Sequence, residues 1–148
     1  MADYKMIDIL LVEDNPHDAE LTLRAFRKYN LASKVFVVED GAAALDFLFC
    51  RGQYEDRSFE NPPKVILLDL KLPKVNGLEV LQELKSHPVT KTFPVVMVTS
   101  SREDRDIKRA YELGVNSYLV KPMNFEEFFL AMFEAGHYWT NRNQATMS

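Results

Sequence analysis

The chain has 148 residues, of which 47% are hydrophobic and 27% are charged, and this fits about one soluble globular domain with a single buried core. Its net charge of −4 argues against binding to nucleic acid or to an anionic membrane, and no apolar run approaches the roughly 20 residues that span a bilayer. A lone cysteine, Cys50, excludes an intrachain disulfide and, with no signal-peptide pattern at the start, favours a cytoplasmic protein.

Short apolar runs alternate with amphipathic segments along the chain. The runs are rich in Val, Ile and Leu, as in strands that are buried on both faces of a parallel sheet. Asp40 and Asn124 can cap helices, as can Asp14 or Asn15, and Gly114 can end one. In chain order, strands are expected at 7–12, 34–38, 65–68, 93–99 and 115–120, and helices at 16–29, 41–52, 77–86, 102–113 and 125–139.

One connection is unusually long. Residues 51–63 are polar and end on two prolines, and such a length inside a compact domain indicates a functional or a mobile segment. The polar residues after Asn141 are expected to fray. We therefore expect one domain over residues 1–141, a polar tail over residues 142–148, and no output domain.

Five strands that alternate with five helices predict a doubly wound α/β fold, in which a parallel sheet is covered on both faces. Ligands of such sheets bind beyond the carboxyl ends of the strands, and these ends carry Glu13-Asp14, Asp69, Thr99 and Lys121. Taken alone, Asp69 would be an ordinary turn residue. Together with Glu13 and Asp14 it would form a group of carboxylates, which repel one another unless a cation is present. Oxygen-rich, thiol-free ligands suit Mg²⁺. A carboxylate with a divalent cation, a hydroxyl and a lysine predicts a phosphoryl site.

The order of these motifs resembles the receiver domain of two-component response regulators over about residues 5 to 140. The resemblance is strong because several motifs stand at the expected element ends in the expected order. It implies the flavodoxin-like strand order 2-1-3-4-5, which the alternation of elements alone does not fix. The matching residues are Glu13-Asp14, Asp69, Leu72-Pro73, Gly77, Thr99 and Lys121-Pro122.

The resemblance implies a phosphorylation site with a bound metal. Asp69 would accept a phosphoryl group from a phosphohistidine of a sensor histidine kinase. Asp14 and Asp69 would bind Mg²⁺ directly, Glu13 would bind it through a water, and the backbone carbonyl of Lys71 would complete the protein ligands. Lys121 would pair with the phosphoryl oxygens.

The resemblance also implies a switch. Thr99 would turn toward the phosphoryl group, Tyr118 would move inward behind it, and Lys121-Pro122 would be a cis peptide. Two further positions are expected to set the lifetime of the phosphorylated state. These are Lys71, two residues after Asp69, and Ser101, two residues after Thr99.

A narrower resemblance concerns phytochrome-associated response regulators. It is based on the insertion after Leu48, on the sequence from Ala44 to Leu48, and on the aromatic end of the last helix. It implies a phytochrome-type kinase as the partner.

Other functions have less support in the sequence. An aspartyl-phosphate phosphohydrolase usually needs a second Asp as general acid two residues after the nucleophile, and here that position is Lys71. The glycines form neither G-x-G nor a phosphate-binding loop, which argues against a nucleotide-binding module. A pseudo-receiver that is never phosphorylated would not need the full set of site residues. We therefore expect a signalling phospho-acceptor, not an enzyme, with at most slow self-dephosphorylation.

The histidines and the last helix have simpler interpretations. His17, His87 and His137 show no metal-ligand spacing and are expected to be surface or capping residues. The last helix has apolar residues at i, i+3, i+4 and i+7 spacing, which predicts a core-facing stripe. The residues of this stripe are Phe125, Phe128, Phe129, Met132 and Gly136.

A second set of apolar residues in and after the last helix indicates an interface. These residues give the last helix more apolar area than a solvated helix needs, and nearby charged residues can form a polar margin around them. We expect a homodimer through the surface of the fourth helix, the fifth strand and the last helix. The interface residues would be Leu130, Phe133, Tyr138 and Trp139.

Overall fold

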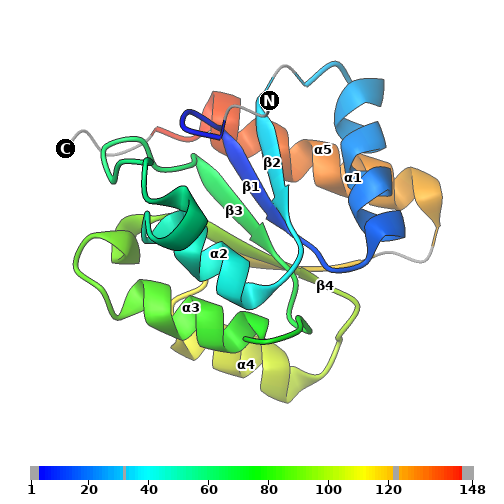
Figure 1. Cartoon of the computed structure of the whole chain (residues 1–148). Helices are drawn as coiled ribbons and strands as arrows, with labels where there is room; N and C mark the ends of the chain where they lie inside the picture. The colour runs from blue at the N-terminus through cyan, green and yellow to red at the C-terminus, as the bar shows by residue number, and fades with distance from the viewer. Residues whose placement is uncertain (1–3, 32, 122–123, 145–148) are drawn as a thin grey trace.

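The computed structural model describes residues 4–31, 33–121 and 124–144, and it has one central sheet (Figure 1). All strand pairs are parallel, and the strand order is β2-β1-β3-β4-β5. The predicted flavodoxin-like order is therefore confirmed. The strands are β1 (Ile9–Val12), β2 (Val35–Val38), β3 (Val65–Leu68), β4 (Val95–Thr99) and β5 (Ser117–Val120).

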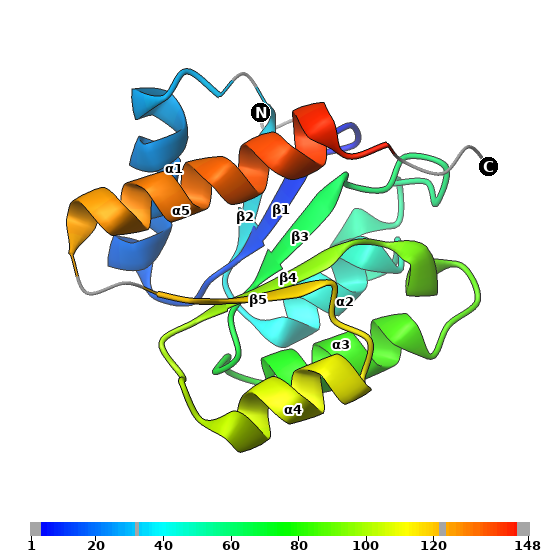
Figure 2. The ribbon, with the colours of Figure 1, turned by 180° about the vertical axis from the view of Figure 1, so that it is seen from behind.

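Helices cover both faces of the sheet. The helices are α1 (Pro16–Lys28), α2 (Gly41–Leu48), α3 (Gly77–Lys85), α4 (Asp104–Glu112) and α5 (Phe125–His137). Helices α1 and α5 lie on one face, and α2, α3 and α4 lie on the other (Figures 1 and 2). None of these described helices is long and apolar enough to cross a membrane.

The sheet separates two apolar cores. Successive side chains of a strand point to opposite faces, so Leu10 enters the core under α2, α3 and α4, whereas Leu11 enters the core under α1 and α5. Strands β1, β3 and β4 are buried along their whole length, while the edge strands β2 and β5 are mostly half-buried. This explains why the central strands are apolar at every position except Thr99 at the end of β4.

Side-chain caps begin most of the helices. Asn15, not Asp14, caps α1 by accepting hydrogen bonds from the backbone N–H groups of His17 and Asp18. Asp40 and Asn124 cap α2 and α5, as predicted. Asp14 is thereby left without a capping role, which keeps its carboxylate available for other ligands.

Several elements are shorter than predicted. Ile7 is buried but precedes the paired residues of β1, so burial alone does not extend the strand. Helix α2 ends at Leu48 because Cys50 takes a positive φ of 54°. Strand β5 begins at Ser117 because the N–H of Val115 bonds back to the carbonyl of Ala110 at the end of α4. Beyond α5, a π-helical segment extends to Arg142.

The long 51–63 connection is fixed to the body of the protein. Its Arg57 is 6% exposed and donates hydrogen bonds to the backbone carbonyls of Tyr4, Phe47 and Asn61. The guanidinium also lies 3.8 Å from the centre of the Phe47 ring. The connection therefore ties the chain before β1 to the end of α2.

Candidate functional site

Three carboxylates gather where β1 and β3 end. Because Val12 and Leu68 are register partners in neighbouring parallel strands, the residues that follow them emerge at the same edge of the sheet. Glu13 and Asp14 follow β1, and Asp69 follows β3. One carboxylate oxygen from each of these residues lies within 4.8 Å of the other two. This group is called the acidic cluster below.

Lys121, directly after β5, reaches into the acidic cluster. Its ammonium donates to Glu13 Oε1 at 2.7 Å and lies 3.3 Å from Asp69 Oδ2. A further carboxylate, Asp18 Oδ2, lies 3.1 Å from the same ammonium. Asp18 comes from the first turn of α1 and is absent from the sequence-based site. No signal in the sequence marks it, because an acid in the first turn of a helix is common.

The two oxygens of Asp69 have different surroundings. Oδ1 accepts a hydrogen bond of 2.7 Å from the N–H of Leu70, whereas Oδ2 faces Lys121. The start of α3 packs against the segment that follows Asp69, and the N–H of Gly77 donates a hydrogen bond to the carbonyl of Leu70. A Cβ at Gly77 would lie 2.2 Å from the Asp69 carbonyl oxygen, so only glycine permits this approach.

Burial and mutual repulsion shape the charges of the site. Burial raises the pKa of Glu13 to about 7, against the hydrogen bond and the charge of Lys121, which lower it. Burial alone would lower the pKa of Lys121, but the hydrogen bond to Glu13 and the charge of Asp69 outweigh it and raise the pKa. Lys121 is therefore a fixed positive charge, and it faces more carboxylate groups than it can neutralise.

The acidic cluster fits a divalent cation. The Asp14 carboxylate is exposed and has no hydrogen bond or ion pair with any residue in the described ranges, so it is free to bind a metal. Lys71 and Asp14 line the same cavity of about 560 Å³, while the Lys71 side chain is exposed. A donor set of carboxylate and carbonyl oxygens is what Mg²⁺ and similar cations prefer.

A hydrogen-bonded path leads from the site to α4. Thr99 is 1% exposed, and its hydroxyl accepts from the N–H of Ser101 at 3.3 Å. The Tyr118 hydroxyl donates to the carbonyl of the same Ser101 at 3.1 Å. The Ser101 hydroxyl donates to Asp106 of α4 at 2.6 Å, so this side chain is directed to the helix. The cis peptide predicted before Pro122 lies outside the described residues.

The apolar residues of α5 differ from the expectations in two places. Phe125 is 61% exposed at the start of the helix, so its assignment to the core stripe is wrong, while Phe128 and Met132 are buried as predicted. Phe133 lies with its ring centre 4.8 Å from that of Tyr29, so it belongs to the seam between α1 and the last helix.

The other predicted interface residues are divided between surface and core. Leu130 and Tyr138 are 46% and 50% exposed. Trp139 packs against the core under α1 and α5, and its ring meets that of Tyr138 at 5.1 Å. Leu130 and Tyr138 are thus the exposed members of the expected interface, while Phe133 and Trp139 are half-buried, and the interface itself stays a prediction.

Comparison with known proteins identifies relatives of the same architecture. A model of the response regulator receiver domain matches residues 9–133. The probable methanogenesis regulatory protein FilR2 of Methanothrix harundinacea is 41% identical, over 93% of this chain and 86% of that protein. The response regulator Rcp1 of Synechocystis sp. is 39% identical, over 88% of this chain and 87% of its own length.

Solved structures agree with the sequence relatives. The Mn²⁺-bound form of Rcp1 has a TM-score of 0.86 at 36% identity and covers 95% of this chain and 99% of that one. The bacteriophytochrome response regulator AtBRR is 48% identical with a TM-score of 0.75, covering 97% of this chain and 98% of that one. The chain therefore belongs to the response regulator receiver domain family, whose members accept a phosphoryl group.

Proposed function

We propose that Asp69 is the residue that accepts a phosphoryl group from a phosphohistidine of a sensor histidine kinase. The observation that supports this most directly is the position of its carboxylate, 3.3 Å from the Lys121 ammonium and inside the acidic cluster with Glu13 and Asp14. The chain would act as a signalling phospho-acceptor and not as an enzyme that turns over a substrate.

The transfer would form one bond and break one bond. The N–H of Leu70 holds Asp69 Oδ1, which leaves Oδ2 to attack the phosphorus beside Lys121. The P–N bond of the phosphohistidine breaks, and its electron pair returns to the imidazole of the kinase. Lys121 would then exchange its carboxylate partners for phosphoryl oxygens, because the transferred group brings new negative charge to the same place.

We propose Mg²⁺ as the cation of the site. Asp14 and Asp69 would bind it directly, Glu13 through a water, and Lys71 through its backbone carbonyl. When bound, the cation offsets charge on the phosphoryl oxygens and relieves the repulsion between the carboxylates.

The switch would pass through Ser101. When the Thr99 hydroxyl turns to the phosphoryl group, it gives up its bond from the Ser101 N–H, and the loop that Tyr118 also holds must adjust. Because the Ser101 hydroxyl binds Asp106, the adjustment reaches α4. Pro122 would contribute to the switch through the peptide bond that it forms with Lys121. The result is a phosphorylation-dependent protein–protein surface.

The partners follow from the relatives and from the exposed residues. A phytochrome-type kinase is proposed because AtBRR is described as a bacteriophytochrome response regulator. Such phosphotransfer, together with the lone Cys50, also favours a cytoplasmic location. A homodimer through α4, β5 and α5 would bury the exposed Leu130 and Tyr138.

Intact mass spectrometry tests the phosphorylation site. Incubation with acetyl phosphate and Mg²⁺ should add one phosphoryl group to the wild type and none to Asp69→Asn. Asp104→Asn, an exposed carboxylate in the first turn of α4, is the matched control and should label normally. Undiminished labelling of Asp69→Asn would refute the assignment. Steady release of phosphate from phosphoesters would favour a phosphohydrolase, and absence of any labelling would favour a pseudo-receiver.

Sedimentation velocity tests the homodimer. Leu130→Glu should split it while circular dichroism shows a folded chain, and Met6→Glu, an exposed apolar residue outside α5, should leave it intact. A wild type that is monomeric with and without phosphorylation would contradict the proposal.

A further inference from the structure

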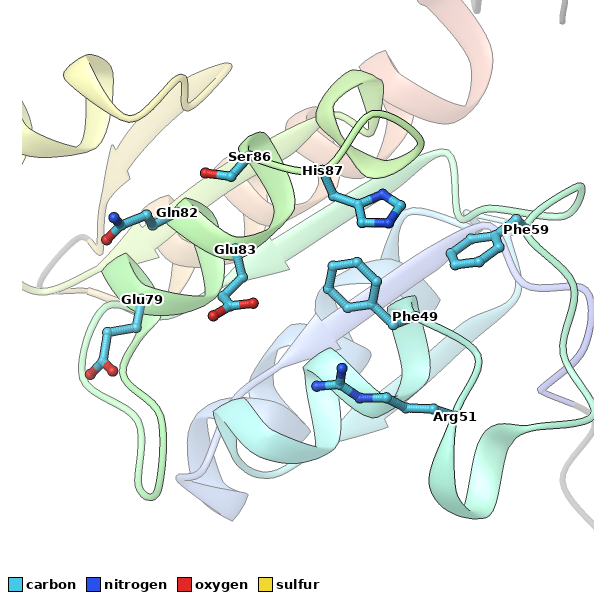
Figure 3. A pocket seen from close by; sticks show the side chains of 8 residues that line it. All are labelled: Phe49, Arg51, Phe59, Glu79, Gln82, Glu83, Ser86 and His87. Atoms are coloured by element: carbon cyan, nitrogen blue, oxygen red, sulfur yellow. The ribbon is translucent and has the colours of Figure 1, made fainter.

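A groove of about 710 Å³ runs along α3, away from the acidic cluster (Figure 3). One side is α3 itself, and the other is formed by the end of α2 and the 51–63 connection. None of the residues that line the groove belongs to the acidic cluster. Any ligand that binds here would therefore use a surface distinct from the phosphoryl site.

Aromatic rings form one end of the groove. The ring of His87 lies 5.2 Å from that of Phe49, edge to face, and 6.2 Å from that of Phe59, nearly parallel. The Nδ1 atom of His87 accepts a hydrogen bond from the N–H of Val89, which fixes the ring in place. Phe59 is 39% exposed, so the aromatic end offers an apolar surface to a ligand.

Unpaired acidic side chains form the wall along α3. Glu79 and Glu83 are four residues apart on the helix, both are exposed, and neither carboxylate has a hydrogen bond or ion pair with another described residue. Like charges at this spacing destabilise a helix. Figure 3 shows both side chains along the groove on the α3 side.

The arginine of the groove does not neutralise this wall. Arg51 pairs with Asp46 at 3.0 Å, and its guanidinium lies 5.3 Å from the centre of the Phe49 ring. Because its charge is already matched by Asp46, the groove keeps the negative charge of the two glutamates. The site thus combines an aromatic surface with uncompensated acid.

We propose that this groove binds an arginine-containing segment of a protein partner, independently of phosphorylation. The aliphatic stem of an arginine would lie on Phe49 and Phe59, and its planar guanidinium would reach the carboxylates of Glu79 and Glu83. Arginine fits better than lysine because its fork can bind two carboxylate oxygens while it stacks on a ring. The proposal goes beyond the phospho-acceptor function, because it assigns a second surface that needs no phosphoryl group.

A peptide titration followed by NMR tests the groove. The probe is a short arginine–leucine peptide, added to the full ¹⁵N-labelled chain in saturating Mg²⁺ so that the acidic cluster does not attract it. Amide shifts should be confined to α3 and residues 49–59. Peptides with glutamine or lysine in place of arginine should bind more weakly, and Asp69→Asn should bind the arginine peptide as the wild type does. That last result separates this proposal from the proposed phosphorylation.

Two variants measure the contribution of the acidic wall. Glu83→Lys should weaken binding by about tenfold or more, because it places a like charge against the arginine. Glu55→Lys, an exposed acid of the connection that does not line the groove, should change the affinity by less than about twofold. Phe59→Ala should also weaken binding, and circular dichroism would show that each variant is folded.

Three outcomes would overturn the proposal. The first is equal weakening by Glu83→Lys and Glu55→Lys, which would indicate a response to net charge alone. The second is a set of amide shifts centred on Asp14 and Asp69, which would place the peptide at the phosphoryl site. The third is no peptide binding while concentrated chain shifts its own groove amides, which would assign the surface to a second copy of the chain.

Discussion

Two buried cations hold different parts of this protein, and they differ in the oxygens that they bind. Lys121, with a side chain that is 12% exposed, binds the carboxylates of Glu13, Asp18 and Asp69. Arg57, 6% exposed, binds backbone carbonyls and lies on the face of Phe47. One cation is thus surrounded by charged side chains, and the other by neutral groups of the main chain.

The nature of the partners decides what each cation can do. Carboxylates can be protonated, can bind a metal, and can give up an ammonium when a phosphoryl group arrives, so Lys121 suits a site that changes state. Backbone carbonyls carry no net charge and are not protonated near neutral pH, although they can bind a metal, and burying them without a donor is costly. The planar fork of Arg57, with its several fixed donors, suits a permanent connection. Whether a buried cation takes part in a switch or only stabilises the fold therefore depends on the groups that it contacts.

Removal of Arg57 should have the largest effect on stability. Arg57→Met would remove the side-chain donor from the carbonyls of Tyr4 and Asn61 and leave the Phe47 carbonyl with only the N–H of Cys50. We expect the free energy of unfolding to fall by about 3 kcal/mol. Chemical denaturation measures this loss. Arg57→Lys keeps the charge but not the fork, and it should recover only part of the stability. Full stability of Arg57→Met would show that the connection is not fixed by this residue.

Removal of Lys121 should act mainly on phosphorylation. Lys121→Met keeps an apolar stem of similar length but has no ammonium for the phosphoryl oxygens, so labelling by acetyl phosphate should slow by about 100-fold. In saturating Mg²⁺ the loss of stability should be smaller than that of Arg57→Met, because the cation offsets the carboxylates. Arg57→Met should label at the wild-type rate while folded. Normal labelling of Lys121→Met together with slow labelling of folded Arg57→Met would contradict the different roles given to the two cations.

Metal binding should stabilise the acidic cluster. Mg²⁺ at about 100 times its dissociation constant should raise the free energy of unfolding of the wild type by about 2.7 kcal/mol. Asp14→Asn should lose most of this gain, because Asp14 is the exposed carboxylate without a partner among the described residues. Without Mg²⁺, the same variant should be more stable than the wild type, since one repelling charge is gone. An equal response of both proteins to Mg²⁺ would exclude Asp14 as a ligand.

The sequence predicts the carboxyl edge of the sheet well and the Arg57 connection poorly, for a physical reason. β1 and β3 are apolar at every position, and β4 is apolar up to Thr99, so the ends of these strands and the polar residues there can be located from the chain alone. The partners of Arg57 are backbone carbonyls, which every residue has, so no residue pattern marks them. The sequence therefore predicts where the polar connection lies, but it does not predict that Arg57 holds the connection in place.

Residues at helix starts are also hard to place from the sequence. Phe125 continues the apolar spacing of α5, yet this first residue of the helix is exposed, whereas Phe128 is buried. Asp18 looks like a common acid in a first helical turn, and only the folded chain brings it to Lys121. Periodicity predicts which face of a helix is apolar, but not which residues of that face the folded chain covers.

Asp18 should have a modest effect on the phosphorylated state. It competes with a phosphoryl group for the Lys121 ammonium at 3.1 Å, so Asp18→Asn should raise the phosphorylated fraction at a fixed level of acetyl phosphate by about threefold. Glu20→Gln on the same helix, which pairs with Arg24 and Arg27, is the control and should have no effect. A decrease in the phosphorylated fraction of Asp18→Asn would mean that Asp18 positions Lys121 instead of competing for it.

Lys71 should have the smallest effect, on the lifetime of the phosphorylated state. Its exposed side chain borders the cavity that Asp14 also lines, so its ammonium can reach phosphoryl oxygens and obstruct the water that attacks in line. Lys71→Asn should therefore lose its phosphoryl group about twofold faster than the wild type, a change typical of an exposed charge. The decay of the labelled protein, followed by intact mass, measures it.

Lys74 provides the control for Lys71, because it is a nearby exposed lysine whose charge is matched by Asp40 at 3.5 Å. Lys74→Asn removes the same charge and should leave the decay unchanged. If both variants decay faster, the effect comes from net charge near the site and not from a contact with the phosphoryl group. Unchanged decay in Lys71→Asn would contradict the proposal, and slower decay in this variant alone would mean that the ammonium assists the attacking water. A cation at this edge would then promote the loss of the phosphoryl group that Lys121 helps to bind.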